Sequence, residues 1–233
     1  MATAVQYSDM KTVVFFDIDG TLLRSGGAGK LAMMTAVQEA FGVAPTPVEV
    51  PFSGRTDRAI MRDLLHAHKI EFTSDNFHRL VETYLQLLPE CLQRMTGRVL
   101  PGVLELLQAL ERLDHVAVGL LTGNLRRGAQ TKLGYFGLAE RFPFGGFGDV
   151  HFDRNSVARD ALAAAQCFLN GSCAPERIWV IGDTPLDIEC ARHIGARVLA
   201  VATGTHTLEQ LAAHQPDLLL SDLRQYGLLL ERL

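Results

Sequence analysis

The chain has 233 residues, of which 48% are apolar and 21% charged, as in ordinary globular proteins with one large or two modest domains. Its formal net charge of −4 and the lack of any run of Lys or Arg argue against nucleic-acid binding. No apolar run approaches the roughly 18 residues of a membrane helix, and the N-terminus shows neither a basic leader nor a signal core. These features predict a cytoplasmic protein that binds neither nucleic acid nor membrane.

The first predicted element is an apolar run, Val13 to Phe16, that ends in Asp17, Ile18, Asp19 and Gly20. Consecutive β-formers before a turn residue predict a buried central strand of a parallel sheet, and ligands of such sheets bind at the carboxyl ends of strands. Alternation sends Asp17 and Asp19 to the same side, where two carboxylates repel unless a cation or a shared proton intervenes. We expect a hard divalent cation, Mg²⁺, to fit best.

This segment has two other interpretations. A calcium loop is excluded because the twelfth position from Asp17 is Ala28, where such a loop carries a bidentate Glu. A simple surface turn remains an alternative for an isolated Asp-x-Asp-Gly, since Asp and Gly are common turn residues.

A glycine-rich link and a helical region follow. The link from Arg24 to Lys30 is not a Walker loop, because Arg24 stands where the first Gly belongs and Leu31 follows Lys30, so we predict a flexible hinge. The periodicity then predicts helices over 31–41, 56–68 and 74–95, with Asp57 and Ser74 as caps of the second and third.

Strand and helix alternate from residue 97 onward. Pro101 opens a helix, and the strands that we predict cover 116–121, 177–181, 196–202 and, at an edge, 218–220. Helices between them imply right-handed parallel crossovers. The predicted fold class is therefore α/β, a doubly wound parallel sheet formed by residues 1–23 and 97–233, with an all-helical insertion over 24–96.

The later strands also end in polar clusters. After the second strand comes Thr122-Gly123-Asn124, where a hydroxyl, a permissive glycine and a helix start suit an anion. The third strand leads into two further carboxylates, Asp183 and Asp187. Because the ends of parallel strands open on one side, we expect up to four aspartates to face a hydroxyl and amide cradle, with Arg154 as a fixed cation.

Together these segments resemble the motifs of the haloacid dehalogenase superfamily, in its phosphatase branch close to phosphoglycolate phosphatases. Residues 17–22 are similar to the first motif, Thr122 with the two leucines before it to the second, and residues 182–187 to the fourth. The resemblance covers the whole core and implies that the insertion over 24–96 is a cap domain.

The third motif departs from the family pattern. It usually supplies a Lys just before the helix that precedes the fourth motif, but Asp153, Arg154 and Asn155 occupy that region, and Lys132 lies too early. We assign the role to Arg154. The alternative is Arg159, which a helix beginning near Ser156 would carry farther from its N-terminal end.

The reaction that the resemblance implies is Mg²⁺-dependent hydrolysis of a phosphomonoester through an aspartyl-phosphate. Asp17 would be the nucleophile, and the metal would be held by Asp17, the Asp19 backbone carbonyl and Asp183. Asp19 would act as general acid and then general base. The phosphoryl oxygens would be held by Thr122, Gly123, Asn124 and Arg154. Asp187 would orient metal-bound water or brace Arg154.

Substrate choice is expected to lie in the cap. Arg55 follows a short glycine-containing turn and would grip a carboxylate or second phosphate, as phosphoglycolate would require, or else be an exposed arginine at a helix start. The expected partner is a small phosphorylated metabolite. A phosphomutase and a non-catalytic protein of the same fold are the alternatives.

Overall fold

The computed structural model describes residues 11–45 and 49–233. Its main element is a six-stranded parallel sheet in the order β5-β4-β1-β6-β7-β8. The strands are β1 (Lys11–Phe16), β4 (Val116–Leu121), β5 (Gly145–Gly146), β6 (Cys173–Gly182), β7 (Arg197–Val201) and β8 (Leu218–Leu220). The predicted parallel α/β sheet is confirmed.

Strand β1 lies in the interior of the sheet because its side chains are apolar on both faces. Val13 and Phe15 pack into one apolar cluster and Val14 and Phe16 into the other, and all four are fully buried. Complete burial of such side chains contributes on the order of 1.5–3 kcal/mol each, so a polar substitution in β1 would destabilise the sheet.

Helices cover both faces of the sheet. One face packs against α4 (Val103–Leu110), α5 (Arg126–Tyr135) and α9 (Gly227–Leu230). The other packs against α6 (Arg154–Phe168), α7 (Pro185–His193) and α8 (Leu208–Ala212). Short 3₁₀ turns lie at Ala139–Arg141 and Leu223–Gln225. No helix in the described part of the chain is long and apolar enough to cross a membrane.

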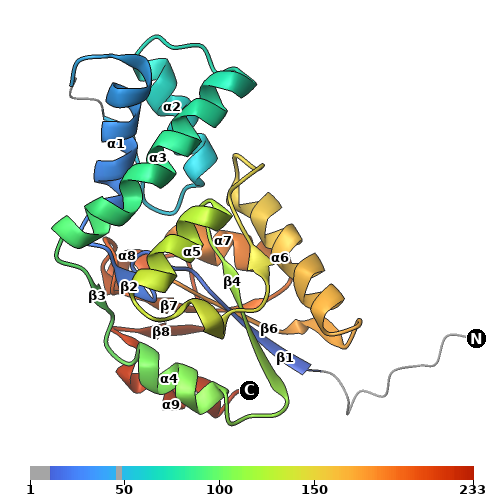
Figure 1. Cartoon of the computed structure of the whole chain (residues 1–233). Coiled ribbons are helices and arrows are strands. Elements are labelled where there is room, and N and C mark those ends of the chain that lie inside the picture. The colour runs from blue at the N-terminus through green and yellow to red at the C-terminus, as the bar shows by residue number, and fades with distance from the viewer. Residues whose placement is uncertain (1–10, 46–48) are drawn as a thin grey trace, which may run out of the picture.

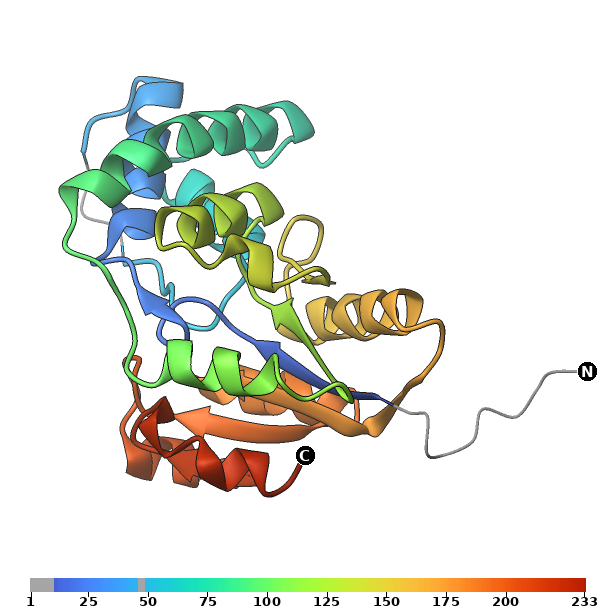
Figure 2. The same ribbon diagram turned by 60° about the horizontal axis from the view of Figure 1, so that its bottom comes forward.

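Three further helices form a separate layer around an apolar cluster of their own (Figure 1). They are α1 (Ala28–Phe41), α2 (Asp57–Ala67) and α3 (Ser74–Arg94). The layer stands apart from the sheet with α3 against α5, at the opposite end of the molecule from α4 and α9 (Figures 1 and 2). Two short antiparallel strands, β2 (Leu23–Arg24) and β3 (Arg98–Val99), lead into and out of it.

Some predicted element boundaries are wrong by a few residues. The caps of α2 and α3 are Thr56 and Thr73, not Asp57 and Ser74, because each threonine hydroxyl accepts a hydrogen bond from the backbone N–H three residues later, at 3.2 Å. Helix α6 begins at Arg154 rather than near Ser156, since Asp153 caps it. Strand β6 begins at Cys173, four residues before the predicted start.

Candidate active site

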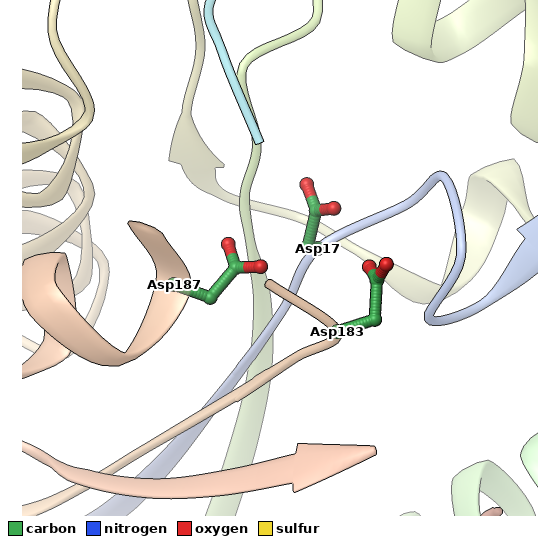
Figure 3. A group of neighbouring side chains, drawn as sticks. All are labelled: Asp17, Asp183 and Asp187. Carbon is green, nitrogen blue, oxygen red and sulfur yellow. The ribbon is translucent and has the colours of Figure 1, made fainter. Parts of the chain in front are cut away.

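Three aspartates meet where strands β1 and β6 end. Asp17 directly follows β1, Asp183 directly follows β6, and Asp187 lies in the first turn of α7. One carboxylate oxygen from each lies within 4.8 Å of the others. Figure 3 shows the three side chains rising to the same side of the strand ends. The structure therefore brings together three of the four aspartates that the sequence singled out.

Burial makes these carboxylates hard to ionise without a cation. It raises the pKa of Asp17 to about 6, with the charges of Asp187 and Asp19 adding to the rise and Arg154 opposing it. The pKa of Asp183 lies well above its usual range, because of burial and then of Asp187 and Asp17. Asp183 accepts a hydrogen bond from the Thr21 hydroxyl at 3.1 Å. A buried group of hard oxygen donors with raised pKa values fits a divalent cation such as Mg²⁺.

Arg154 is the cation beside the predicted nucleophile. It is buried, and its Nη1 lies 3.3 Å from Asp17 Oδ1 while Nη2 donates to Asp187 Oδ1. Burial by itself would lower the pKa of Arg154, but the charges of Asp187 and Asp17 raise it above its ordinary value. Arg159 is exposed and donates instead to the Ser156 hydroxyl at 2.7 Å. Because α6 begins at residue 154, Arg154 lies at the start of this helix beside the aspartates, whereas Arg159 lies more than one turn farther along it.

Asp187 has further partners that hold it in place. Its Oδ2 accepts hydrogen bonds from the Thr184 backbone N–H at 3.0 Å and from the Thr184 hydroxyl at 2.7 Å, which completes the capping box of α7. The other oxygen, Oδ1, accepts a hydrogen bond from Arg154, so Asp187 holds that guanidinium in place.

Asp19 is not part of the three-aspartate group and pairs with Lys132. Lys132 Nζ donates to Asp19 Oδ2 at 2.5 Å and to Asn124 Oδ1 at 2.6 Å, and Asn124 Nδ2 donates to the same Asp19 oxygen at 3.0 Å. The Lys132 side chain is 5% exposed and that of Asp19 is 40% exposed. Asn124 Nδ2 also donates to the Thr122 hydroxyl at 2.8 Å.

Lys132 is the residue that the sequence did not place in the site. It belongs to α5, whose buried face includes Gly128 and Lys132 one turn apart. Long helical side chains point back toward the N-terminus of their helix, and α5 starts next to the Asn124 loop. The sequence feature that could have identified Lys132 as a site residue is therefore its position about two helical turns after that loop.

A loop from the separate helical layer presses onto the Thr122–Asn124 segment. The Asp57 backbone N–H donates to the Gly123 carbonyl oxygen at 2.7 Å, and a Cβ on Gly123 would lie 2.1 Å from the Arg55 carbonyl oxygen. Any side chain at position 123 would therefore push this loop away. The buried Asp57 carboxylate accepts from the Leu125 N–H at 2.8 Å, and burial raises its pKa to about 7.

The site opens into a cavity of about 540 Å³. Its lining includes Asp17, Asp19 and Arg154 at the strand ends and Gly204 and Thr205 after β7. Residues 24–96 supply another part of the wall, with apolar contributions from Met33, Phe52 and Ile60.

Arg55 lines the cavity but is already paired. Its Nη2 lies 2.6 Å from Asp63 Oδ2, and its Nη1 donates to the Pro51 carbonyl oxygen at 3.0 Å. The structure thus places Arg55 at the predicted site with its charge balanced by Asp63.

Comparison with known proteins gives consistent matches. A family model described as haloacid dehalogenase-like hydrolase matches residues 14–192. The phosphoglycolate phosphatase of Synechococcus elongatus is 28% identical over 218 residues, which span 91% of this chain and 95% of that protein. CbbY from Rhodobacter sphaeroides, solved in complex with phosphate, has a TM-score of 0.73 at 17% identity and covers 94% of this chain and 97% of its own. A hydrolase from Pseudomonas syringae has a TM-score of 0.72 at 21% identity and covers 96% of this chain and 99% of its own.

Proposed function

This chain belongs to the haloacid dehalogenase-like hydrolases, in their phosphatase branch, and we propose that it hydrolyses a small phosphomonoester through an aspartyl-phosphate on Asp17. The resemblance of three motifs predicted this family, and the match over most of the chain confirms it. The observation that carries the proposed reaction is the position of Asp17, in the lining of the cavity between the Arg154 guanidinium and Asp183.

In the first half of the reaction, an Asp17 carboxylate oxygen attacks phosphorus and the bond to the leaving alkoxide breaks. Asp19 takes part in this step in its protonated form, gives its proton to that alkoxide and becomes a carboxylate. The phosphoryl oxygens are held by Arg154, the Thr122 hydroxyl and the amides of Gly123 and Asn124. Mg²⁺ held by Asp17, Asp183 and the Asp19 backbone carbonyl would neutralise charge between nucleophile and phosphate.

The second half regenerates the enzyme. Asp19, now a carboxylate, takes a proton from water, and the resulting hydroxide attacks phosphorus and releases phosphate from Asp17. Asp187 keeps Arg154 aligned with Asp17 in both steps through its contact with the guanidinium.

We further propose that residues 24–96 act as a cap that encloses the substrate. The cavity has the volume of sites that bind ligands of drug size, roughly 300–1,000 Å³, so it can hold an alcohol group larger than glycolate. Arg55 would read an anionic group of the substrate by exchanging part of its contact with Asp63. The relative's name supports phosphoglycolate as one substrate to test.

The experiment is a phosphate-release screen over small phosphorylated metabolites with and without Mg²⁺. We expect release that stops with chelator, returns with Mg²⁺, and is abolished in Asp17→Asn. Full activity after exhaustive chelation, or activity retained by Asp17→Asn, would refute the proposed site. Transfer of phosphate between sugar phosphates without release would indicate a phosphomutase instead.

A further inference from the structure

We propose that Lys132 is a positioning residue that fixes the Asp19 carboxylate, and that Gly29 of α1 lets the helical layer cover the Lys132 ammonium group. The inference rests on the proposed function, because it gives Asp19 the acid and base steps. It extends that function by assigning roles to Lys132, which the sequence motifs do not include, and to Gly29, which lies against the Lys132 side chain.

Lys132 and Asn124 together hold one oxygen of Asp19. Both side chains donate to Oδ2, at 2.5 and 3.0 Å, and they are joined to each other by the 2.6 Å contact between Lys132 Nζ and Asn124 Oδ1. No described residue donates a hydrogen bond to the other oxygen, Oδ1, and Asp19 lines the cavity. The arrangement therefore fixes the carboxylate while leaving one oxygen for the substrate.

The two buried cations of the site have separate partners. Arg154 contacts Asp17 and Asp187, whereas Lys132 contacts Asp19 and Asn124. Lys132 therefore acts on the acid and base rather than on the nucleophile. A proton donor works only within hydrogen-bond reach of its target, so a carboxylate free to rotate in a cavity would lose much of its effect.

Gly29 explains how Lys132 is kept from water. A Cβ on Gly29 would lie 3.1 Å from Lys132 Nζ and 3.3 Å from Lys132 Cε, closer than a comfortable contact. The absence of a side chain thus lets the first turn of α1 lie directly over the ammonium group. Because ion pairs weaken when water screens them, this cover strengthens the contact between Lys132 and Asp19.

The first test is Lys132→Met, which keeps the length of the side chain and removes its charge. We expect kcat/KM on an alkyl phosphate such as glycerol 2-phosphate to fall about tenfold more than on 4-nitrophenyl phosphate, because only the alkoxide needs a well-placed proton donor. In an Asp19→Asn background, Lys132→Met should cost less than about twofold, since a residue that acts through Asp19 has nothing left to position.

The second test is Gly29→Ala, which places a methyl group against the same ammonium group. Alanine is the better helix former, so the thermal stability of α1 should not fall. We expect kcat/KM to fall less than in Lys132→Met, and again to fall more on the alkyl phosphate than on 4-nitrophenyl phosphate. The matched control is Gly134→Ala on α5, where a Cβ meets nothing within 4 Å, and both substrates should be hydrolysed as by the wild type.

The outcomes separate this inference from the proposed function. Equal losses on both substrates, or additive losses of Lys132→Met and Asp19→Asn, would overturn the positioning role. The role assigned to Gly29 would be overturned if Gly29→Ala, like the Gly134→Ala control, hydrolysed both substrates as the wild type does. If Asp17→Asn abolishes activity in the same experiments, the proposed function stands and the positioning role alone has failed; if Asp17→Asn stays active, the proposed function has failed.

Discussion

Replacing Arg154 by Met should destabilise the protein strongly, whereas replacing Arg159 by Met should not. Arg154 is 5% exposed and faces two carboxylates that are themselves buried, Asp17 at 5% and Asp187 at 0%. Removing one partner of a buried ion pair typically costs about 3–5 kcal/mol, because the charge left behind has lost its compensation. Arg159 is exposed, so its loss should stay within about 0.5 kcal/mol.

The assay is urea unfolding followed by the fluorescence of Trp179, the single tryptophan, which is 1% exposed. Without metal, the free energy of unfolding of Arg154→Met should be lower than that of the wild type by the stated amount. The deficit should shrink as the pH falls, because carboxylates without their cation gain stability on protonation. It should also shrink when Mg²⁺ is added, since a cation bound to the folded state offsets the same repulsion.

The result that would refute this reasoning is a loss below about 1 kcal/mol for Arg154→Met, which is less than a buried ion pair allows. An equal loss of unfolding free energy in Arg159→Met and Arg154→Met would also refute it, because Arg154 would then not be distinguished as the cation that pairs with the buried aspartates. The two variants should also differ in activity: Arg154→Met should slow every phosphomonoester, and Arg159→Met should slow none.

Two further predictions concern buried groups at the junction of the helical layer and the sheet. Burial raises the pKa of Asp57 from 3.8 to about 7, so the folded state holds this proton more tightly than the unfolded chain, and the associated stability is complete below pH 3.8 and is lost as the pH rises toward 7. The free energy of unfolding of Asp57→Asn in urea, relative to that of the wild type, should therefore increase as the pH rises, by at most about 4 kcal/mol. A difference between the two proteins that is the same at all pH values would contradict this. The Tyr84 hydroxyl is buried and has no hydrogen-bond partner among the described residues, so Tyr84→Phe should not lower the melting temperature, while Tyr84→Ala should cost about 3–5 kcal/mol. A clear loss in Tyr84→Phe would show that the hydroxyl has a partner.

The sequence was sufficient for the parts of the molecule that depend on local patterns. Residues 13–16 are an uninterrupted run of apolar β-formers before a turn residue, which predicts a strand covered on both faces, and they are fully buried in β1. The same pattern before Asp183 predicted a second strand, so both aspartates were expected at the carboxyl ends of strands. Thr122 and Asn124 were predicted for the same reason, as the first polar residues after a buried strand.

Parts that depend on three-dimensional contacts were not predictable in this way. Lys132 reaches the site from within a helix, and its partner Asp19 is far away in the sequence. The pairing of Arg55 with Asp63 also escaped the sequence analysis, because it forms across the first turns of α2. Strands β2 and β3 have two residues each, too few for any periodicity.

The central claim is that Asp17 becomes phosphorylated during turnover, and the most direct test is to trap that state. In the Asp19→Asn variant, 4-nitrophenyl phosphate should still phosphorylate the enzyme, because its leaving group needs no proton, while hydrolysis of the intermediate should be slow without the base. After acid quenching, peptide mass spectrometry should find a phosphoryl group on Asp17 in samples with Mg²⁺ and none in samples with chelator. Nitrophenol release without phosphorylated Asp17, or a phosphoryl group on another residue, would contradict the account.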